Sequence, residues 1–129
     1  MYSETTADIS VHVEPEFLSE QSNAEENFFL YAYKITIENN SHRSCQLVKR
    51  HWIIRDGIGR EEHVEGDGVI GKQPVIGPGE RFSYTSGCPL STPTGNMRGK
   101  YTMKTAEKQM SIKVPLFFLR PGSPASDGH

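Results

Sequence analysis

The stretch FLYAYKITI at residues 29–37 decides the fold class. Apolar side chains occupy every second position of this stretch: Phe29, Tyr31, Tyr33, Ile35 and Ile37. A period of two places them on one face of a β-strand, while the residues between them point to the other face. The stretch therefore predicts a strand with one buried and one more polar face.

The same period recurs along the chain and predicts further strands. It is found at residues 9–13, 82–84, 101–103 and 110–114. We expect Pro115 to end the last of these strands, because proline has no N–H for a sheet. Residues 47–54 are partly apolar on both faces, which is typical of a central strand. No segment shows a sustained helical period.

Turn signals separate the predicted strands at short intervals. They are Asn39-Asn40-Ser41, Asp56-Gly57-Ile58-Gly59, Gly77-Pro78-Gly79 and residues 105–108. Glycine accepts positive φ and proline presets a turn corner, so these clusters favour hairpins and tight connections. We therefore predict an all-β fold, an immunoglobulin-like or fibronectin type III-like β-sandwich of seven to eight antiparallel strands.

Length and composition indicate one globular domain. A chain of 129 residues, 35% hydrophobic and 23% charged, is long enough for one core and too polar for a bilayer. We predict an N-terminal arm at 1–7, the sandwich at 8–120 and a disordered tail at 121–129. The chain has no apolar run of membrane-spanning length and no signal peptide at its start, so we expect a cytoplasmic protein without membrane contact.

Charge is distributed unevenly although the net charge is only -2. Residues 1–33 carry seven acids and no lysine or arginine, whereas residues 43–60 carry five bases and one acid. The basic segment suits an anionic partner, or is neutralised if the acidic N-terminal strand pairs beside it. A nucleic-acid partner is not expected, because nucleic-acid-binding domains usually carry a strong positive excess.

Residues 66–71, Gly66-Asp67-Gly68-Val69-Ile70-Gly71, match the pattern G-x-G-x-x-G. That pattern binds a pyrophosphate when a helix follows it, and here Pro74 follows without any helical period. One remaining hypothesis is a nest of N–H groups at Gly66, Gly68 and Gly71, with Lys72 beside it, as a phosphate or ligand loop. The alternative is a tight bulged loop between strands.

Trp52 is the only tryptophan and lies mid-strand between two arginines, Arg50 and Arg55. A buried tryptophan in the core is the default in a sandwich. The functional alternative is an exposed anchor for a protein partner, formed by Arg50, Trp52 and Arg55. A free sheet edge also makes a homodimer plausible.

Catalytic and metal chemistry have little support in the sequence. Cys88 with His51 or His63 as base lacks a strand-turn-helix elbow, so Cys88 and Cys45 are expected as buried thiols. The acidic run Glu61, Glu62, His63, Glu65 and Asp67 has oxygen ligands for a divalent cation, but is typical of a solvated face. His12 beside Glu14 forms no zinc-binding pair. We predict no catalytic residue, no metal site and no cofactor.

Several blocks of the sequence resemble the ApaG family. They are residues 50–56 (RHWIIRD), 71–80 (GKQPVIGPGE), 82–90 (FSYTSGCPL) and 92–101 (TPTGNMRGKY). The resemblance runs from about residue 11 to 119 and departs in the 56–62 hairpin and at the ends. It implies an immunoglobulin-like or fibronectin-type sandwich and no agreed catalytic residues.

ApaG-like domains occur alone in bacteria and as modules of larger proteins, including an F-box protein and a polymerase-interacting protein. The resemblance therefore implies a non-catalytic, protein-binding role for a domain without a defined biochemical activity. It also implies, as the alternative, a link to cobalt and magnesium tolerance or to a pyrophosphate-containing nucleotide at the 66–72 loop. Our prediction is protein-protein interaction, with nucleotide or divalent-cation binding as the alternative.

Overall fold

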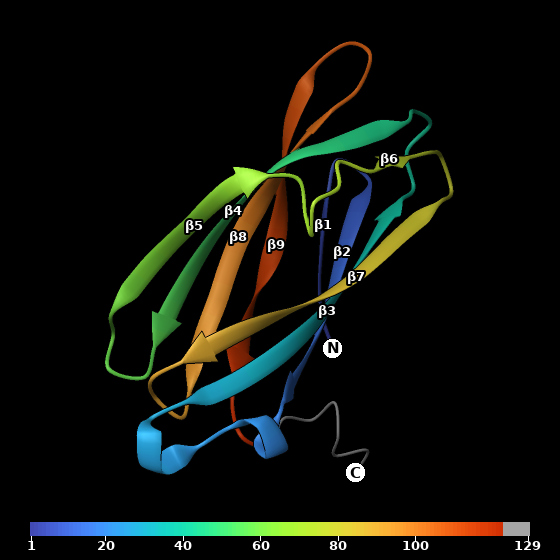
Figure 1. Cartoon of the computed structure of the whole chain (residues 1–129). Helices are drawn as coiled ribbons and strands as arrows, with labels where there is room; N and C mark the ends of the chain where they lie inside the picture. Colours follow the sequence, from blue (N-terminus) through green and yellow to red (C-terminus); the bar gives the residue numbers. More distant parts are fainter. Residues whose placement is uncertain (123–129) are drawn as a thin grey trace.

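The computed structural model describes residues 1–122. These residues form nine strands and two short 3-10 helices (Figure 1): β1 (Tyr2–Thr6), β2 (Ile9–Phe17), η1 (Ser19–Gln21), η2 (Ala24–Glu26), β3 (Phe29–Asn39), β4 (Cys45–Asp56), β5 (Glu61–Asp67), β6 (Val75–Ile76), β7 (Arg81–Leu90), β8 (Gly95–Lys104) and β9 (Gln109–Leu119). No helix in the described residues is long and apolar enough to cross a membrane.

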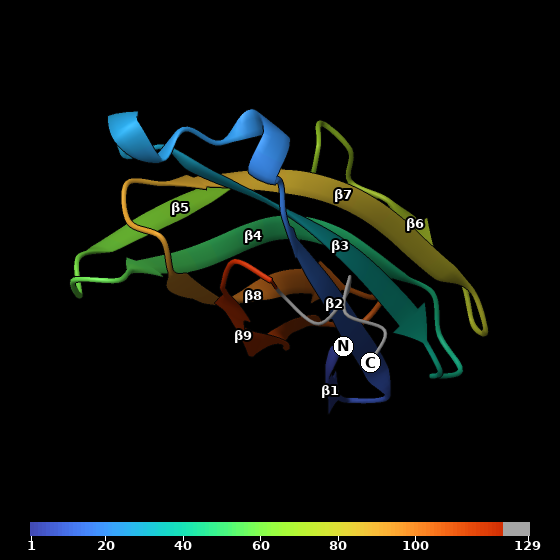
Figure 2. The same ribbon diagram turned by 90° about the horizontal axis from the view of Figure 1, so that it is seen from below.

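The strands form two packed sheets, which Figure 2 shows as two layers. One sheet has the order β1-β2-β3-β7, and the other has the order β5-β4-β8-β9 with β6 added to β4. Every paired strand is antiparallel, and the chain changes sheet between β3 and β4, between β6 and β7 and between β7 and β8. The predicted immunoglobulin-like sandwich is confirmed, and β4 is a central strand as predicted.

The N-terminal end of the chain differs from the sequence prediction. Residues 1–122 contain nine strands rather than seven to eight, because the predicted arm forms β1 and because β6 is a two-residue strand without a period. β1 pairs with β2 along its whole length, from Tyr2 opposite Val13 to Thr6 opposite Ile9. Most of the predicted tail, residues 123–129, lies outside the described residues.

The sequence predicted that Pro115 ends the last strand, and the structure shows that this prediction is wrong. β9 continues through it to Leu119, and the β8–β9 register shifts at this point, because Gly99 lies opposite Val114 whereas Met97 lies opposite Phe117. The extra residue on β9 is a β-bulge, which leaves a position where no ladder N–H is needed. The strand therefore tolerates a proline that a regular ladder would exclude.

The acidic N-terminal segment does not neutralise the basic segment by pairing beside it. β1 and β2 belong to one sheet and β4 to the other. The acids that lie opposite the β4 bases come from β5 instead, with Asp67 opposite Lys49 and Glu61 opposite Arg55. The expectation that the N-terminal strand neutralises the basic segment is therefore wrong, because the opposing acids belong to β5.

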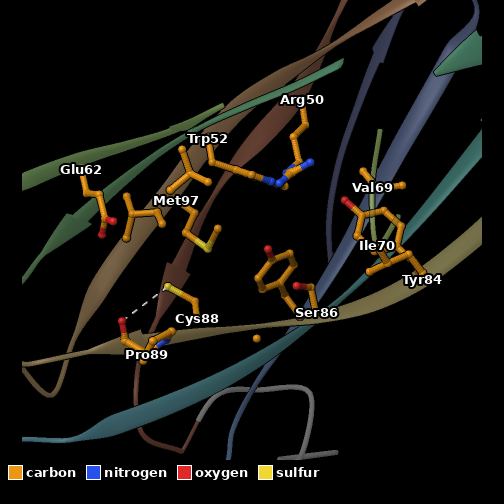
Figure 3. Close-up of a pocket in the computed structure, with 14 residues that line it drawn as sticks. Arg50, Trp52, Glu62, Val69, Ile70, Tyr84, Ser86, Cys88, Pro89 and Met97 are labelled. Carbon is orange, nitrogen blue, oxygen red and sulfur yellow. Dashed lines mark hydrogen bonds between the residues drawn. The ribbon is translucent and has the colours of Figure 1, made fainter. Parts of the chain in front are cut away.

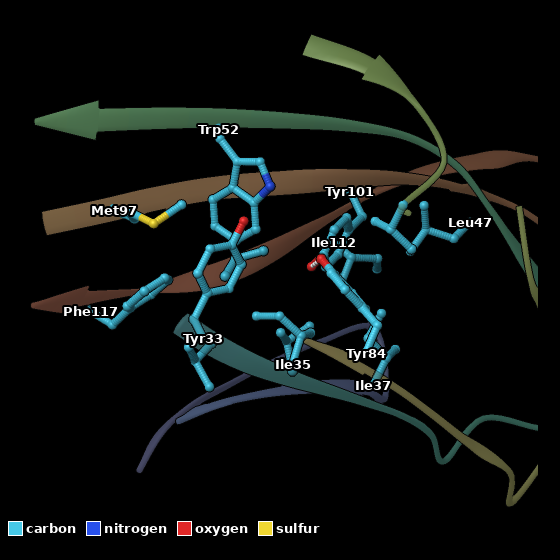
Figure 4. Close-up of a cluster of buried hydrophobic side chains, with 14 of the residues drawn as sticks. Tyr33, Ile35, Ile37, Leu47, Trp52, Tyr84, Met97, Tyr101, Ile112 and Phe117 are labelled. Atoms are coloured by element: carbon cyan, nitrogen blue, oxygen red, sulfur yellow. Dashed lines mark hydrogen bonds between the residues drawn. The ribbon is translucent and has the colours of Figure 1, made fainter. Parts of the chain in front are cut away.

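Aromatic side chains join the two sheets in the core (Figure 4). The ring of Trp52 from β4 meets Tyr33, Tyr101 and Phe117 at centroid distances of 5.5, 6.2 and 6.1 Å, in edge-to-face arrangements. Such pairs contribute about 0.5–1.5 kcal/mol each beyond the area they bury. Since Trp52 is only 4% exposed, its interpretation as a core residue is confirmed.

Asn39 at the end of β3 is a fully buried polar side chain that holds three segments together. Its Nδ2 group donates to the carbonyls of Arg43 at 2.7 Å and Ile76 at 2.8 Å. Its Oδ1 accepts from the backbone N–H of Ser41 at 3.0 Å and from the Ser41 hydroxyl at 2.6 Å. The β3–β4 turn and β6 thus share one buried amide.

We predict that Asn39→Asp lowers the free energy of unfolding by about 2–4 kcal/mol, because the carboxylate cannot donate to the two carbonyls. Urea unfolding followed by tryptophan fluorescence measures the change. The exposed neighbour provides the control, since Asn40→Asp should stay within about 0.5 kcal/mol of the parent protein. Equal stability of the two variants would show that the Asn39 amide does not hold the turn and β6.

Candidate functional site

The sandwich is closed on one side and open on the other. On the closed side β1 lies against β9, and the Lys113 N–H donates to the Thr6 hydroxyl at 3.4 Å. On the open side the edge strands β5 and β7 leave a cleft of about 380 Å³ between the sheets. Its walls come from β3, β4, β5, β7, β8 and the 66–72 loop. This volume falls in the range of small-ligand sites.

The floor of the cleft is rigid and mostly apolar. Trp52, Met97, Tyr33 and Cys88 line it, and all four side chains are buried parts of the core. Figure 3 shows Met97 and Cys88 near the middle of the cleft. A floor made of core residues keeps its shape, because each side chain is held by packing.

A single guanidinium lies at one end of the cleft. Nη1 of Arg50 donates to the carbonyls of Asp67 at 3.1 Å and Gly68 at 2.9 Å, so the side chain reaches from β4 to the glycine loop. Within residues 1–122 no carboxylate forms an ion pair with it. The cleft therefore contains a half-buried positive charge that only carbonyl dipoles offset.

Glu62 lines the opposite end of the cleft (Figure 3). Along the β4–β5 ladder Arg50 lies opposite Gly66 and Ile54 lies opposite Glu62, four residues further on. At about 3.3 Å per residue, this offset places the two charges roughly 13 Å apart along the strands. The cleft is therefore polar at both ends, with opposite signs, and apolar between them.

Tyrosine and cysteine groups around the cleft stay neutral. Burial raises the pKa of Tyr33, Tyr84 and Tyr101, and the opposing effect of the Arg50 charge is smaller. Burial, with a further contribution from Glu62, raises the pKa of the Cys88 thiol to about 12. The cleft thus offers hydroxyl groups, apolar surface and one cation, which are groups that can contact a ligand.

The glycine loop closes one end of the cleft as a tight turn. The Val69 N–H donates to the Lys72 carbonyl at 2.8 Å, and the Lys72 N–H donates back to Val69 at 2.9 Å. The two residues between them, Ile70 and Gly71, have φ values of 44° and 76°. Positive φ at both central residues is the geometry of a two-residue hairpin turn. The tight-loop alternative agrees with this geometry, and no helix follows in residues 72–122.

At each of the three loop positions a residue other than glycine would be unfavourable, either because a Cβ would clash or because φ is positive. A Cβ at Gly66 would lie 2.9 Å from two nitrogens of Arg50, and a Cβ at Gly68 would lie 2.0 Å from the Lys72 carbonyl oxygen. Gly71 has open space around it but positive φ. The Gly68 N–H donates to the Val48 carbonyl at 2.8 Å, so one of the three N–H groups of the proposed nest is already bonded. Lys72 is exposed beside the turn.

We predict that Gly68→Ala costs at least about 3 kcal/mol of stability, because the methyl group meets a backbone carbonyl and φ is positive. Gly71→Ala should cost only about 1–2 kcal/mol, since strain in φ is its single penalty. Thermal unfolding of both variants beside the parent protein measures the two costs. A Gly71 variant as unstable as the Gly68 variant would contradict this steric account.

The structure separates the three residues predicted as a partner anchor. Arg50 and Trp52 face the cleft, whereas Arg55 is exposed and lines a different, more open pocket with Asp56 and Phe118. The alternation of a strand explains this, because positions 50 and 52 share one face and position 55 belongs to the other. The prediction of an exposed Trp52 anchor is therefore corrected, and Arg50 remains as the part that faces the cleft.

The candidate catalytic groups do not meet. Cys88 points into the sandwich and is 2% exposed, whereas His51 lies on the outer face, where its Nε2 is 2.9 Å from Nδ1 of His63. Cys45 and Cys88 are free and buried, as expected. The acidic run of β5 alternates between the two faces of its sheet, and no group of three potential ligands within residues 1–122 is arranged to hold a metal ion.

We predict that the Cys88 thiol reacts slowly with iodoacetamide in the native protein. A pKa raised from the ordinary 9.0 to about 12 lowers the thiolate fraction at pH 8 by about a thousandfold. Mass spectrometry of the Cys88 peptide, with and without urea, measures the labelling rate. Rapid native labelling at Cys88, at the rate seen in urea, would contradict its burial.

Two residues of the site were missed in the sequence. Glu62 appeared only as part of an acidic run, because strand alternation had not been assigned there. Ile70 appeared only as a variable position of the glycine motif. Its signal is the mismatch between residue type and turn, since two-residue hairpin turns favour Asn or Asp before glycine and this turn has isoleucine.

Comparison with known proteins gives consistent matches. The ApaG domain model matches residues 19–105. The chain is 52% identical over 120 residues to the ApaG protein of Afipia carboxidovorans, and the match covers 92% of each chain. It is 51% identical, with the same coverage, to the ApaG protein of a Methylobacterium species. The crystal structure of the ApaA protein of Bordetella pertussis has a TM-score of 0.86 and 41% identity, covering 88% of this chain and 94% of that one.

Proposed function

This chain belongs to the ApaG domain family, and we propose that it is a non-catalytic protein-binding domain whose contact surface is the rim of the β5–β7 cleft. The observation that carries the proposal is Ile70 at the tip of the glycine loop. Its side chain is 52% exposed although its backbone has a φ of 44°.

Ile70 lowers the stability of the unbound domain for two reasons. A β-branched residue at positive φ is strained, by about 1–2 kcal/mol, and an exposed isoleucine gains little from burial. Asparagine would satisfy the same turn with less strain. An apolar side chain held beside a cleft under strain is accounted for by contact with a partner, because strained residues cluster at binding sites.

The edge strands beside the loop support the same surface. β5 and β7 are edges of their sheets on the open side, and an extended segment of a partner can add to such an edge. β5 carries four acids in seven residues, Glu61, Glu62, Glu65 and Asp67, so two copies pairing through β5 would bring like charges together. We therefore favour a different protein over the homodimer as the partner.

We predict that Ile70→Asn stabilises the domain by about 1 kcal/mol and weakens partner binding at least about tenfold. The tagged domain is used to capture proteins from the native cytosolic extract, and retained proteins are quantified by mass spectrometry. A captured protein counts as the partner only if its purified form binds the wild-type domain in solution. The stability gain separates lost contact from misfolding.

Ile58→Asn is the matched control, because Ile58 is 70% exposed in the β4–β5 turn at the other end of β5 (Figure 1). It should leave capture unchanged. If Ile70→Asn retains the partner as well as Ile58→Asn does, the rim of the cleft is not the contact surface. Sedimentation of the purified domain decides separately whether the retained partner is a second copy.

The alternative of a nucleotide or Mg²⁺ at the 66–72 loop is tested on the same protein. Diphosphate, ADP or Mg²⁺ bound there would shift the amide signals of Gly66, Gly68 and Gly71. The Gly68 N–H already donates to the Val48 carbonyl, and the Val69 and Lys72 N–H groups close the turn, which favours a structural role of the loop. Unshifted signals at saturating ligand would remove the alternative.

A further inference from the structure

We propose that the interior of the cleft binds a small organic monocarboxylate, with the carboxylate on Arg50 and an apolar body over Trp52 and Met97. This site lies behind the rim that carries Ile70, and it does not depend on a protein partner. The cleft has a cation at one end, apolar side chains along the floor and a carboxylate at the far end.

Arg50 supplies the anion-binding group. A guanidinium carries five N–H donors in a planar fork, and the hydrogen bonds of Arg50 within residues 1–122 use Nη1 only. These two bonds anchor the side chain to Asp67 and Gly68, so that its remaining donors are held in place at the cleft. A carboxylate is the group whose geometry matches such a fork, and it neutralises a charge that is otherwise half-buried without an ion pair.

Gly66 makes the position of Arg50 possible. A Cβ there would lie 2.9 Å from both terminal nitrogens of the guanidinium, so any other residue would displace it. The missing side chain therefore lets β5 and the guanidinium lie in contact. This close approach orients the fork before any ligand arrives, and preorganisation lowers the entropy cost of binding.

The apolar section sets the body of the ligand. Trp52, Met97 and Val64 lie between the two polar ends, and Ile54 and Pro89 extend this surface. A cleft of about 380 Å³ has room for a phenyl or short alkyl chain. Burial of such a body contributes about 25 cal/mol per Å² removed from water.

The charge at the far end selects against multiply charged anions. Glu62 is the acid that lines the cleft, whereas Glu61, Glu65 and Asp67 belong to the other face of β5. A dicarboxylate or diphosphate that reached Arg50 would place its second charge nearer Glu62, where like charges repel. A monocarboxylate leaves its uncharged end there instead.

The test compares two ligands of one shape on the wild-type protein. ¹⁵N-labelled protein is titrated with 4-phenylbutyrate and, separately, with the neutral 4-phenylbutanamide. We expect the carboxylate to shift the Trp52 indole signal and the Gly66 and Gly68 amides, and to bind at least about tenfold more tightly than the amide. Equal affinity of the two ligands, or no shift with either, would overturn the proposal without any variant.

Two variants on one strand locate the charge. Arg50→Met should remove the preference for the carboxylate, whereas Arg55→Met, the same change on the other face of β4, should leave it unchanged. If both variants keep the preference, or if the shifts gather on His51 and Lys100 of the outer face, the site is not the cleft. Glu62→Gln should raise carboxylate affinity about two- to threefold, and diphosphate should bind more weakly than the monocarboxylate.

Ile70→Asn separates this proposal from the proposed function. It should weaken the protein partner at least about tenfold and carboxylate binding by no more than about threefold, because Arg50 and its two carbonyl bonds remain although Ile70 also lines the cleft. Loss of carboxylate binding in this variant would show that the two surfaces are one. Retained carboxylate binding with no protein partner would leave the small-ligand site standing alone.

Discussion

The two hydrogen bonds from Arg50 to the carbonyls of Asp67 and Gly68 are the contact on which the open side of the molecule depends. They tie the glycine loop to the central strand β4 across the mouth of the cleft. Because the loop is anchored there, Ile70 projects from a turn with defined geometry rather than from a free loop. The same bonds orient a charge that the sandwich core would otherwise exclude.

The interior and one side of the sandwich are closed, so the cleft is confined to the side of β5 and β7. Trp52 of β4 meets Tyr33 of β3 edge to face across the two sheets and packs in the same way against Tyr101 and Phe117 of its own sheet, and β1 covers the β9 edge. Within residues 1–122 no strand covers the free edges of β5 and β7 in this way, and the acids of β5 discourage pairing with a second copy. A stable core thus supports a cleft whose floor does not have to move when something binds.

The cysteine and tyrosine groups of the cleft are held in their neutral forms. The thiol of Cys88 is protonated because burial raises its pKa to about 12, and the nearby tyrosine hydroxyls are neutral for the same reason. The two histidines that were considered as bases, His51 and His63, lie on the outer face of the β5-β4-β8-β9 sheet. What remains inside is an oriented cation, a carboxylate about four strand positions away and apolar surface between them.

Local periodicity in the sequence determined much of the fold. The alternation at 29–37, the two-faced pattern at 47–54 and the missing helix after Gly71 were enough to predict the sandwich, the central strand and the glycine turn. Each of these rests on the geometry of neighbouring residues, where a period of two or a positive φ leaves a mark on residue type.

Only the tertiary structure decided which strands lie side by side, and therefore the site. The pairing of β1 with β2, the bulge at Pro115 and the neutralisation of β4 by β5 all depend on register between segments far apart in sequence. The separation of Arg50 from Arg55 and the place of Glu62 follow from which face of a sheet meets the other sheet. A one-dimensional pattern records that a strand has two faces, but the choice of what each face contacts is made by packing.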